Sequence, residues 1–401
     1  MKKMWNALVV LMIVFIIYMA YDIGKDIKTG LEKPTTGKYQ TEQNSTTPNS
    51  EETTTEKEPR REVSLVAVGD MLGHESVIYA GKRQDGTYDH SVLFEHMKKD
   101  FTEADIAVIN QETIFGGEEF GYGGYPNFNS PEEIGTEEVN AGFDVILHAS
   151  NHTRDVWEKG IENCLDFWKT NHTDTLVLGI NRSKKAQNKI PVLERNGIKF
   201  AMLNYTYGLN GYKLEEGKEY LVNLMDEDKI KKDIAKAKEV ADFIVVFPHW
   251  GEEYQYKPNE EQIRLAQMMS DEGADLIIGT HPHVLESIEW LNGKDGNKTL
   301  CYYSVGNYIS GQTKTHSLLG GMATVKIVKD NGKTYIDDAG LVPIVTHYIW
   351  STGSYLTRTY KLADYTEELA AKHTVLSYDN SFSIANLNKL AKDIVGEQWL
   401  R

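Results

Sequence analysis

The stretch GADLIIGTHPH, residues 273–283, joins a short apolar run to a pair of histidines. The run Leu276–Ile278 is rich in β-branched side chains and is bounded by Asp and Gly, which is typical of a short buried strand. His281 and His283 follow at once, and Pro282 between them favours an extended backbone, in which alternate side chains face the same side. The stretch therefore predicts a strand whose carboxyl end presents two imidazoles.

Four other strand candidates also end in polar side chains, and they are Val63–Val68, Asp105–Ile109, Phe143–Leu147 and Phe243–Phe247. The residues that follow them include Asp70, Glu112, Asn151, His152 and His249. Taken alone, Asp70 can belong to a turn, Glu112 can cap a loop and His152 can donate to a backbone carbonyl. In α/β proteins, however, the carboxyl ends of strands converge on one edge of the sheet, where ligands bind. The joint occurrence of these residues at five strand ends therefore favours a metal site.

The kinds of side chain at these strand ends also indicate the kind of metal. Imidazole, carboxylate and amide oxygen without thiolate suit divalent Mn, Zn or Fe better than Ca or an iron–sulfur cluster. Two such ions can clamp a phosphoryl group and activate water. An unliganded histidine nearby can protonate the leaving oxygen. We therefore expect one or two transition metal ions.

Strand candidates continue along the chain and alternate with helical patterns in its first part. The remaining strand candidates are Thr175–Leu178, Lys199–Asn204, Leu300–Ser304 and Ala323–Val328. The expected helices are Asp155–Asn171, Asp226–Val240 and Glu260–Glu272. In the first of these, Trp157, Ile161, Leu165 and Trp168 recur at helical spacing and predict one buried stripe. This alternation predicts an α/β fold.

The composition excludes one class of partner and constrains another. The chain has 401 residues and a formal net charge of -16, so it lacks the basic balance of a nucleic-acid-binding protein. An anionic polymer would need a local basic groove or bound cations to stay in contact with such a chain. Cys164 and Cys301 form no CxxC pair, which indicates neither a zinc ribbon nor a disulfide scaffold. We expect two ordinary buried thiols, with one disulfide between them as the alternative.

The amino-terminal part has the pattern of a membrane anchor followed by a tether. Met4–Tyr21 is 18 residues long with Asn6 as its one strongly polar residue, enough to span about 27 Å as a helix. Two lysines precede it, which favours a cytoplasmic amino terminus. A cleaved signal peptide is the alternative, but no small-x-small site follows the run. Residues 22–62 are polar and show no apolar periodicity, which indicates a disordered linker.

The order of the motifs resembles the CapA/PgsA family of capsule (poly-γ-glutamate) biosynthesis proteins. The matching motifs are GDML at 69–72, NQE at 110–112, SNHTRD at 150–155, HWGEEY at 249–254, GADLIIGTHPH at 273–283 and YSVGNY at 303–308. The resemblance implies a calcineurin-like metallophosphatase fold, a four-layer αββα sandwich. It would occupy residues 63–350, with residues 351–401 packed on the same domain and the anchor at residues 1–21 before it.

The resemblance also implies roles for individual residues. The metal ligands would be Asp70, Glu112, Asn151, His249, His281 and His283, with Glu112 as the bridging carboxylate. His152 would be the catalytic acid or would stabilise the transition state. Asp155 would orient His152, because a neighbouring carboxylate fixes the tautomer and position of an imidazole. Asp155 capping the following helix is an equal alternative.

Three features depart from the family pattern or remain open. Metallophosphatases carry His two residues after the first Asp, and this chain has Leu72 there. His74 is a candidate substitute at a different spacing, and Thr280 stands where relatives often have His or Ser. The Gly- and aromatic-rich segment 116–125 is either a substrate-facing loop or an insertion without a ligand role.

Two functions are consistent with the sequence. One is a membrane-anchored extracellular protein of capsule biosynthesis that hydrolyses a phosphoester at its metal site. The other is a non-catalytic subunit of polymer binding or export whose metal is structural. In both cases the resemblance implies membrane-embedded polymer synthase subunits and an anionic polymer such as poly-γ-glutamate as partners, at the outer face of the cell membrane.

Overall fold

The computed structural model describes residues 59–352 and 354–401. The expected anchor at Met4–Tyr21 and nearly all of the expected linker lie outside the described residues. Within the described ranges, no helix combines the length and the apolar character needed to cross a membrane.

The first sheet has eight strands and combines a parallel half with an antiparallel half. Its order is β14 (Ser354–Lys361), β13 (Lys333–Ser351), β12 (Leu319–Asp330), β1 (Arg61–Met71), β2 (Ile106–Gln111), β3 (Val145–Leu147) and β4 (Leu176–Leu178), with β11 (Asn307–Ile309) pairing β1. Strands β1 to β4 run parallel, and β12 to β14 are antiparallel to their neighbours. The parallel strands therefore end at the same edge of the sheet.

The second sheet has six strands, and four of them are parallel. Its order is β5 (Val192–Arg195), β6 (Ile198–Thr206), β7 (Phe243–His249), β8 (Leu276–Ile278), β10 (Lys298–Tyr302) and β9 (Ile288–Asn292). Strands β6, β7, β8 and β10 are parallel to one another, while β5 and β9 are antiparallel edge strands.

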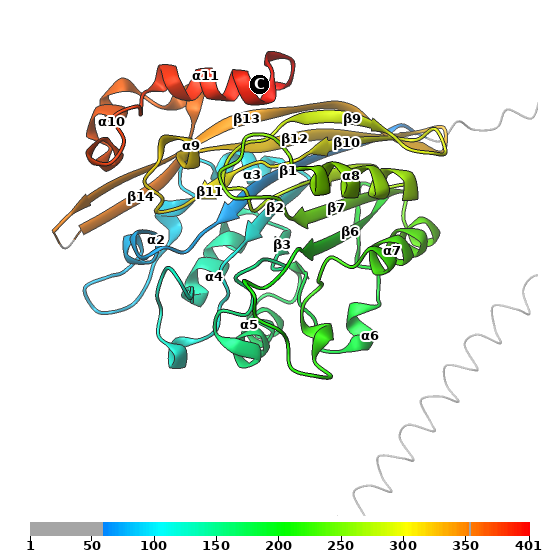
Figure 1. Cartoon of the computed structure of the whole chain (residues 1–401), viewed down its shortest axis with the longest axis horizontal. Coiled ribbons are helices and arrows are strands. Elements are labelled where there is room, and N and C mark those ends of the chain that lie inside the picture. Colours follow the sequence, from blue (N-terminus) through cyan, green and yellow to red (C-terminus); the bar gives the residue numbers. More distant parts are fainter. Residues whose placement is uncertain (1–58, 353) are drawn as a thin grey trace, which may run out of the picture. The chain divides into compact units, whose positions relative to one another are not determined.

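The two sheets pack against each other across a shared apolar core. Leu65 and Val108 of the first sheet belong to the same buried cluster as Phe200 and Phe247 of the second. The alternate side chains of the strands pack against helices on the outer faces. These helices are α3 (Lys98–Glu103), α4 (Glu132–Ala141) and α5 (Trp157–Asn171) on the first sheet and α7 (Glu227–Val240) and α8 (Glu260–Glu272) on the second (Figure 1). The layers run helix, sheet, sheet, helix, and the expected α/β class is confirmed.

Local sequence explains where the longer helices begin and end. Helix α8 has the predicted bounds, because Asn259 and Gln262 form a capping box and Gly273 ends the helix at φ 104°. The predicted buried stripe of α5 is wrong at its first position. Trp157 has a φ of 58° and is 59% exposed, so the stripe begins at Ile161 and continues through Cys164 and Trp168.

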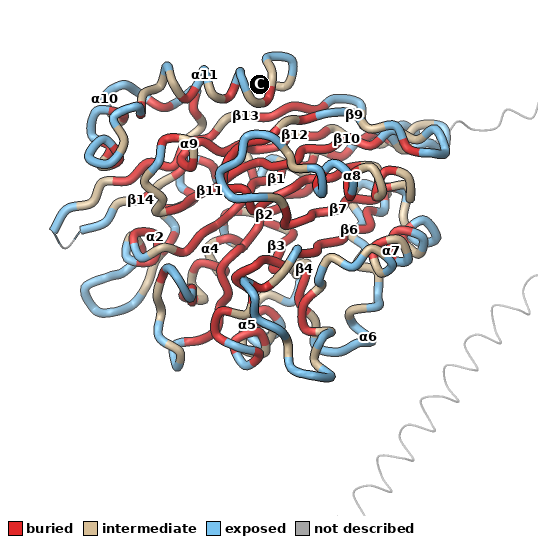
Figure 2. The backbone as a smooth tube through the Cα atoms, viewed as in Figure 1, coloured by how far each residue is buried: buried red, intermediate tan, exposed pale blue. Residues whose placement is uncertain are grey.

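The shorter elements connect the layers and complete the carboxyl-terminal part. They are α2 (Glu75–Ala80), α6 (Lys184–Gln187), α9 (Thr315–Leu318), α10 (Glu367–Lys372), α11 (Ile384–Val395), and the 3₁₀ turns η1 (Ser91–Leu93), η2 (Glu118–Phe120), η3 (Glu219–Leu221), η4 (Leu362–Asp364), η5 (Thr374–Ser377) and η6 (Glu397–Trp399). Leu387 and Ala391 of α11 join the same buried cluster as Leu341 and Val345 of β13. Figure 2 shows the central strands as the buried interior, while many connections and the ends of the β13–β14 hairpin are exposed.

The two cysteines are free thiols, as expected, and both are buried. Cys164 belongs to α5 and packs into the core between the helices and the first sheet, and Cys301 of β10 lies in the core between the second sheet and its helices.

Candidate metal centre

The carboxyl ends of five parallel strands bring the six predicted metal ligands together. Asp70 lies near the end of β1, Glu112 follows β2, and the other four follow or end β3, β7 and β8. Their polar atoms form two groups that could each hold an ion, namely Asp70, Glu112 and His283, and Glu112, His249 and His281. Asn151 joins the second group, because its Oδ1 lies 2.8 Å from His249 Nε2.

A close approach between two strands positions Asp70. The backbone N–H of Asp70 donates to Gly306 O at 3.1 Å, and the register between β1 and β2 shifts at this point. A Cβ on Gly69 would lie 1.8 Å from the same carbonyl oxygen, so only glycine fits there. Such a bulge changes the direction of the following side chain. As a result, Oδ1 of Asp70 accepts from Asn110 Nδ2 at 2.7 Å, and Oδ2 lies 3.0 Å from His283 Nδ1.

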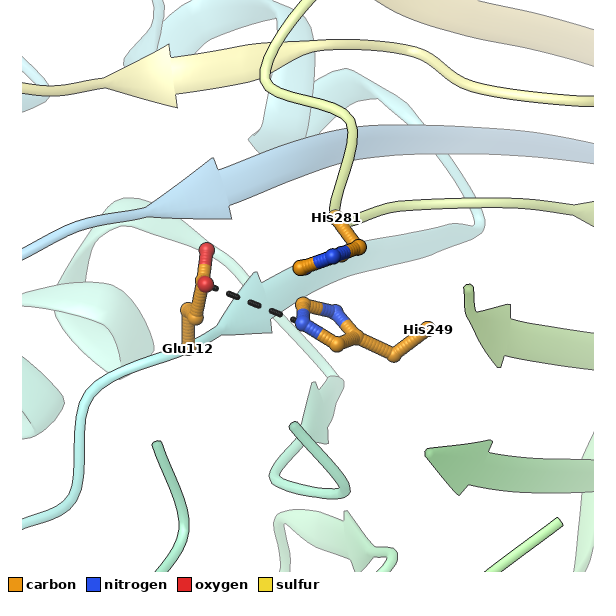
Figure 3. A group of neighbouring side chains, drawn as sticks. All are labelled: Glu112, His249 and His281. Atoms are coloured by element: carbon orange, nitrogen blue, oxygen red, sulfur yellow. Dashed lines mark ion pairs between the residues drawn. The ribbon is translucent and has the colours of Figure 1, made fainter. Parts of the chain in front are cut away.

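Glu112 occupies the position shared by both groups. Its residue is 1% exposed, and neither carboxylate oxygen has a hydrogen-bond partner among the described residues. One oxygen lies 3.7 Å from His249 Nε2 (Figure 3). The other oxygen lies 3.8 Å from His283 Nδ1. Burial and the nearby Asp70 carboxylate raise the pKa of Glu112 well above its ordinary value. A buried carboxylate without partners is costly unless a cation or proton neutralises it.

The second group presents imidazoles in the neutral form that binds metal. His249 Nδ1 lies 3.0 Å from Thr280 Oγ1, which leaves Nε2 facing Asn151 and Glu112. Burial, followed by the neighbouring imidazoles, lowers the pKa of both His249 and His281 well below the ordinary value. His281 Nδ1 is buried without a hydrogen-bond partner in the described part of the chain.

The backbone of the His-x-His segment differs from the prediction of an extended chain. His281 has a φ of 99° and His283 a φ of 60°, both in the left-handed region. The His281 ring therefore belongs to the group with Glu112 and His249, and the His283 ring belongs to the group with Asp70 and Glu112. The centroids of the two rings lie 5.9 Å apart. Gly279 before them is also required, because a Cβ there would lie 1.9 Å from Tyr303 O.

The residues present fit divalent metal ions. No Lys or Arg forms an ion pair with Asp70 or Glu112 in the part of the chain that the structure describes, so only imidazoles offset the two buried carboxylates. The donors are carboxylate, amide oxygen and imidazole, the set that transition metals take in proteins. Asp70, Glu112 and His283 would hold one ion, and Glu112, Asn151, His249 and His281 would hold a second.

His152 lies beside the two groups but belongs to neither. Its Nδ1 lies 2.7 Å from Oδ2 of Asp155, which also accepts from Phe128 N at 2.8 Å. Val156 is the N-cap residue of α5, and no side chain caps that helix, so Asp155 orients His152 instead of capping. The ring also contacts Phe128 at 4.6 Å between centroids. This geometry fixes the imidazole and leaves Nε2 for chemistry.

The candidate substitute His74 is not a ligand in either group. Its Nδ1 accepts from Gly311 N at 3.2 Å, and its ring contacts Phe128 edge-on at 5.2 Å. Burial lowers the pKa of His74 to about 4. Leu72 is buried, with its backbone N–H donating to Ile309 O. His74 therefore does not replace the imidazole that is absent at position 72.

Several residues that contact the predicted ligands were not predicted from the sequence to belong to the site. Tyr207 lies 4.7 Å from His281 and Tyr254 lies 6.0 Å from His283, between ring centroids, and both tyrosines are partly exposed, at 47% and 42%. Asn307 Oδ1 lies 3.0 Å from His283 Nδ1. Only the occurrence of Asn307 in the YSVGNY motif could have singled it out. Tyr125, at the end of the segment 116–125, lies 6.4 Å between ring centroids from Phe128, the residue whose ring contacts His152.

Two facing sheets, helices on both outer faces and imidazole–carboxylate groups at the strand ends define an α/β protein with a candidate metal centre. The model of the bacterial capsule synthesis protein PGA_cap family matches residues 64–312, and the chain belongs to this family.

Individual relatives and solved structures resemble the chain to different extents. The capsule biosynthesis protein CapA of Bacillus anthracis is 30% identical over 63% of this chain and 56% of its own length. The PGA biosynthesis protein CapA of Bacillus subtilis is 36% identical over 44% of each. The chain thus spans about half the length of these relatives. A phosphatase from Mycoplasma pneumoniae (TM-score 0.46, 16% identity, 72% of this chain and 95% of that one) and the calcineurin-like phosphoesterase YfkN from Bacillus subtilis (TM-score 0.40, 14% identity, 71% and 91%) are similar solved structures.

Proposed function

We propose that this capsule-family protein is a metal-dependent hydrolase that cleaves a phosphoester bond. The observation that carries the proposal is the position of Glu112, a buried carboxylate that belongs to two groups of possible metal ligands and has no hydrogen-bond partner within residues 59–352 and 354–401. A carboxylate between two such groups is suited to bridge two cations. Manganese, zinc and iron are the ions that fit the donor set.

Paired divalent ions supply Lewis-acid polarisation of a phosphoryl oxygen and lower the pKa of water. The protein's own contribution is to hold the ions, to position the substrate and to move a proton. Neutral His249 and His281 are ready to ligate without first losing a proton. Tyr207 and Tyr254 flank the two groups and offer exposed ring faces to the part of the substrate that does not react.

His152 is the group placed to protonate the leaving oxygen. Its Nδ1 proton is held by Asp155, so a second proton on Nε2 would be the one transferred. Asp155 is itself buried and fixed by Phe128 N, which keeps the imidazole in one orientation. Asp155 is therefore a positioning residue for His152.

Metal content and hydrolysis of bis(p-nitrophenyl) phosphate by the purified full chain test this proposal together. We expect about two transition metal ions per chain and measurable hydrolysis, and we expect His249→Ala and Asp70→Asn to lose both. His96→Ala is the matched control, because His96 is an exposed histidine that stacks on Tyr360. Hydrolysis that survives in metal-free protein would contradict the proposal.

The alternative function is a subunit of polymer binding or export whose metal is structural. It is favoured by the burial of Asp70, Glu112 and His249 and by Leu72 in place of an imidazole. Two bound ions without turnover on phosphomonoesters or phosphodiesters would support this alternative. In that case removal of the metal should lower stability and polymer binding together.

We further propose that residues 1–21 anchor the chain in the cell membrane with the folded part outside, beside membrane-embedded polymer synthase subunits. The apolar run and its preceding lysines support this orientation. At a net charge of -16, contact with an anionic polymer such as poly-γ-glutamate would depend on bound cations. Protease treatment of intact cells tests the orientation: we expect the folded part to be released, and full protection would contradict it.

A further inference from the structure

We propose that Asn307 is an additional metal ligand, which completes the group of Asp70, Glu112 and His283. Its amide oxygen would take the place of the imidazole that is absent at Leu72. The inference rests on the proposed metal centre and adds to it a residue on β11.

Strand pairing places Asn307 directly beside Asp70. Strand β11 runs parallel to β1, and the register pairs Asn307 with Asp70. On the other side of β1, the register pairs Asp70 with Asn110 of β2. Asp70 therefore lies between two buried asparagines on neighbouring strands. Asn110 turns its amide nitrogen toward the site, and Asn307 turns its amide oxygen toward it.

Hydrogen bonds fix the direction of the Asn307 amide. Its Nδ2 donates to Ser317 O at 2.8 Å and to Gln312 Oε1 at 2.8 Å. A backbone carbonyl can only accept, so the nitrogen of the amide must face Ser317. The oxygen is thereby directed toward His283, and Oδ1 lies 3.0 Å from His283 Nδ1. Asn110, in contrast, presents its nitrogen to Asp70 Oδ1 at 2.7 Å and is a donor there.

Three oxygens converge on one imidazole nitrogen. Around His283 Nδ1 lie Asp70 Oδ2 at 3.0 Å, Asn307 Oδ1 at 3.0 Å and Glu112 Oε2 at 3.8 Å. Ligands about 2.1 Å from a shared ion lie roughly 3.0–3.4 Å from one another in octahedral or tetrahedral geometry. The spacing of the four atoms is close to that of a single coordination sphere. An amide oxygen from Asn307 also gives this group four protein ligands, as Asn151 does for the other group.

Binding of Mn²⁺ to the full chain, followed by calorimetry and elemental analysis, tests this role. The variants are Asn307→Leu, which removes the oxygen, Asn307→Asp, which keeps one, and Asn110→Leu as the matched control. We expect Asn307→Leu to weaken one of two Mn²⁺ sites by more than about 100-fold, the upper end for a residue that only supports a ligand. Asn307→Asp should keep both ions, and Asn110→Leu, which removes a donor to Asp70, should keep both with a loss of at most about 100-fold.

A crystal structure of the Mn²⁺-loaded protein gives the direct answer. We expect Asn307 Oδ1 within about 2.0–2.6 Å of an ion that Asp70 and His283 also bind. An ion there without Asn307, or equal losses in Asn307→Leu and Asn110→Leu, would overturn the inference and leave the metal centre intact. Wild-type protein that binds no ion would overturn both. Because Asn307→Asp retains an oxygen and nearly the same shape, the test does not depend on the folding of Asn307→Leu.

Discussion

Oδ2 of Asp70 lies 3.0 Å from Nδ1 of His283, although 213 residues separate them in the chain. Burial alone would lower the pKa of this histidine, but the Glu112 and Asp70 carboxylates raise it to about 9. Without metal, His283 therefore carries a proton at neutral pH, and its positive charge offsets the charge of the neighbouring carboxylates. This relationship couples metal binding to pH.

We predict that Mn²⁺ binding at pH 7 releases at least one proton. The folded-state pKa of His283 is raised to about 9 from 6.5, so protonation stabilises the metal-free protein fully below pH 6.5, and this contribution is lost as the pH rises through 9. Metal affinity should therefore rise by about tenfold per pH unit from 7 toward 9 for each proton released. Calorimetry in two buffers of different ionisation enthalpy measures the proton count. Binding without proton release would contradict the proposed ligand role of His283.

We predict that His152→Ala lowers kcat for phosphodiester hydrolysis by about 10²–10⁴-fold, the usual contribution of a general acid. Asp155→Asn should lower it less, because the imidazole remains but loses its fixed orientation. Both variants should keep the metal content of the wild type, since neither residue belongs to a metal-binding group. Loss of metal in His152→Ala would make His152 a ligand instead of an acid.

The sequence predicted the strand ends well and the local backbone less well. The positions of Asp70, Glu112 and His249 at strand ends could be predicted, because each lies at the end of an apolar run whose direction the α/β pattern determines. The left-handed backbone of His281 and His283 could not be predicted, because Pro282 between them favours an extended backbone.

The antiparallel strands were the main omission from the fold. Strand β13, at Lys333–Ser351, was not predicted. It pairs with β12, and its buried side chains pack with those of α11. These contacts are made with other segments, so the sequence of β13 alone does not show them. Asn307 lies in the YSVGNY motif, but its closeness to Asp70 could not be predicted, because it depends on the parallel pairing of β11 with β1.

We predict that metal raises the thermal stability of the full chain. An ion that binds only the folded state stabilises it by about 2.7 kcal/mol at a concentration 100 times its Kd. For a protein of this size one such ion should raise the Tm by about 4 °C, and EDTA should reverse the rise. Differential scanning calorimetry with Mn²⁺ and with EDTA measures it, and Asp70→Asn should show a smaller shift. An equal shift in Asp70→Asn would place the bound metal elsewhere.

We predict that Glu138→Gln stabilises the protein at neutral pH. Glu138 of α4 is buried, and neither carboxylate oxygen has a hydrogen-bond partner among the described residues. Burial raises its pKa well above the ordinary 4.5, so its contribution to stability falls as the pH rises above 4.5. Removing the ionisable group should add about 1–3 kcal/mol at pH 8 and little at pH 4. Urea unfolding at both values measures the difference, and a destabilised variant at pH 8 would show that the carboxylate is satisfied.

The position of Glu112 between two metal-binding groups is tested most directly by counting metal in matched glutamate variants. Elemental analysis of the full chain after dialysis against Mn²⁺ compares wild type, Glu112→Gln and Glu138→Gln, each variant replacing one buried glutamate. We predict about two ions in the wild type and in Glu138→Gln, and none retained in Glu112→Gln. A wild type without bound metal, or a Glu112→Gln variant that keeps both ions, would contradict this account.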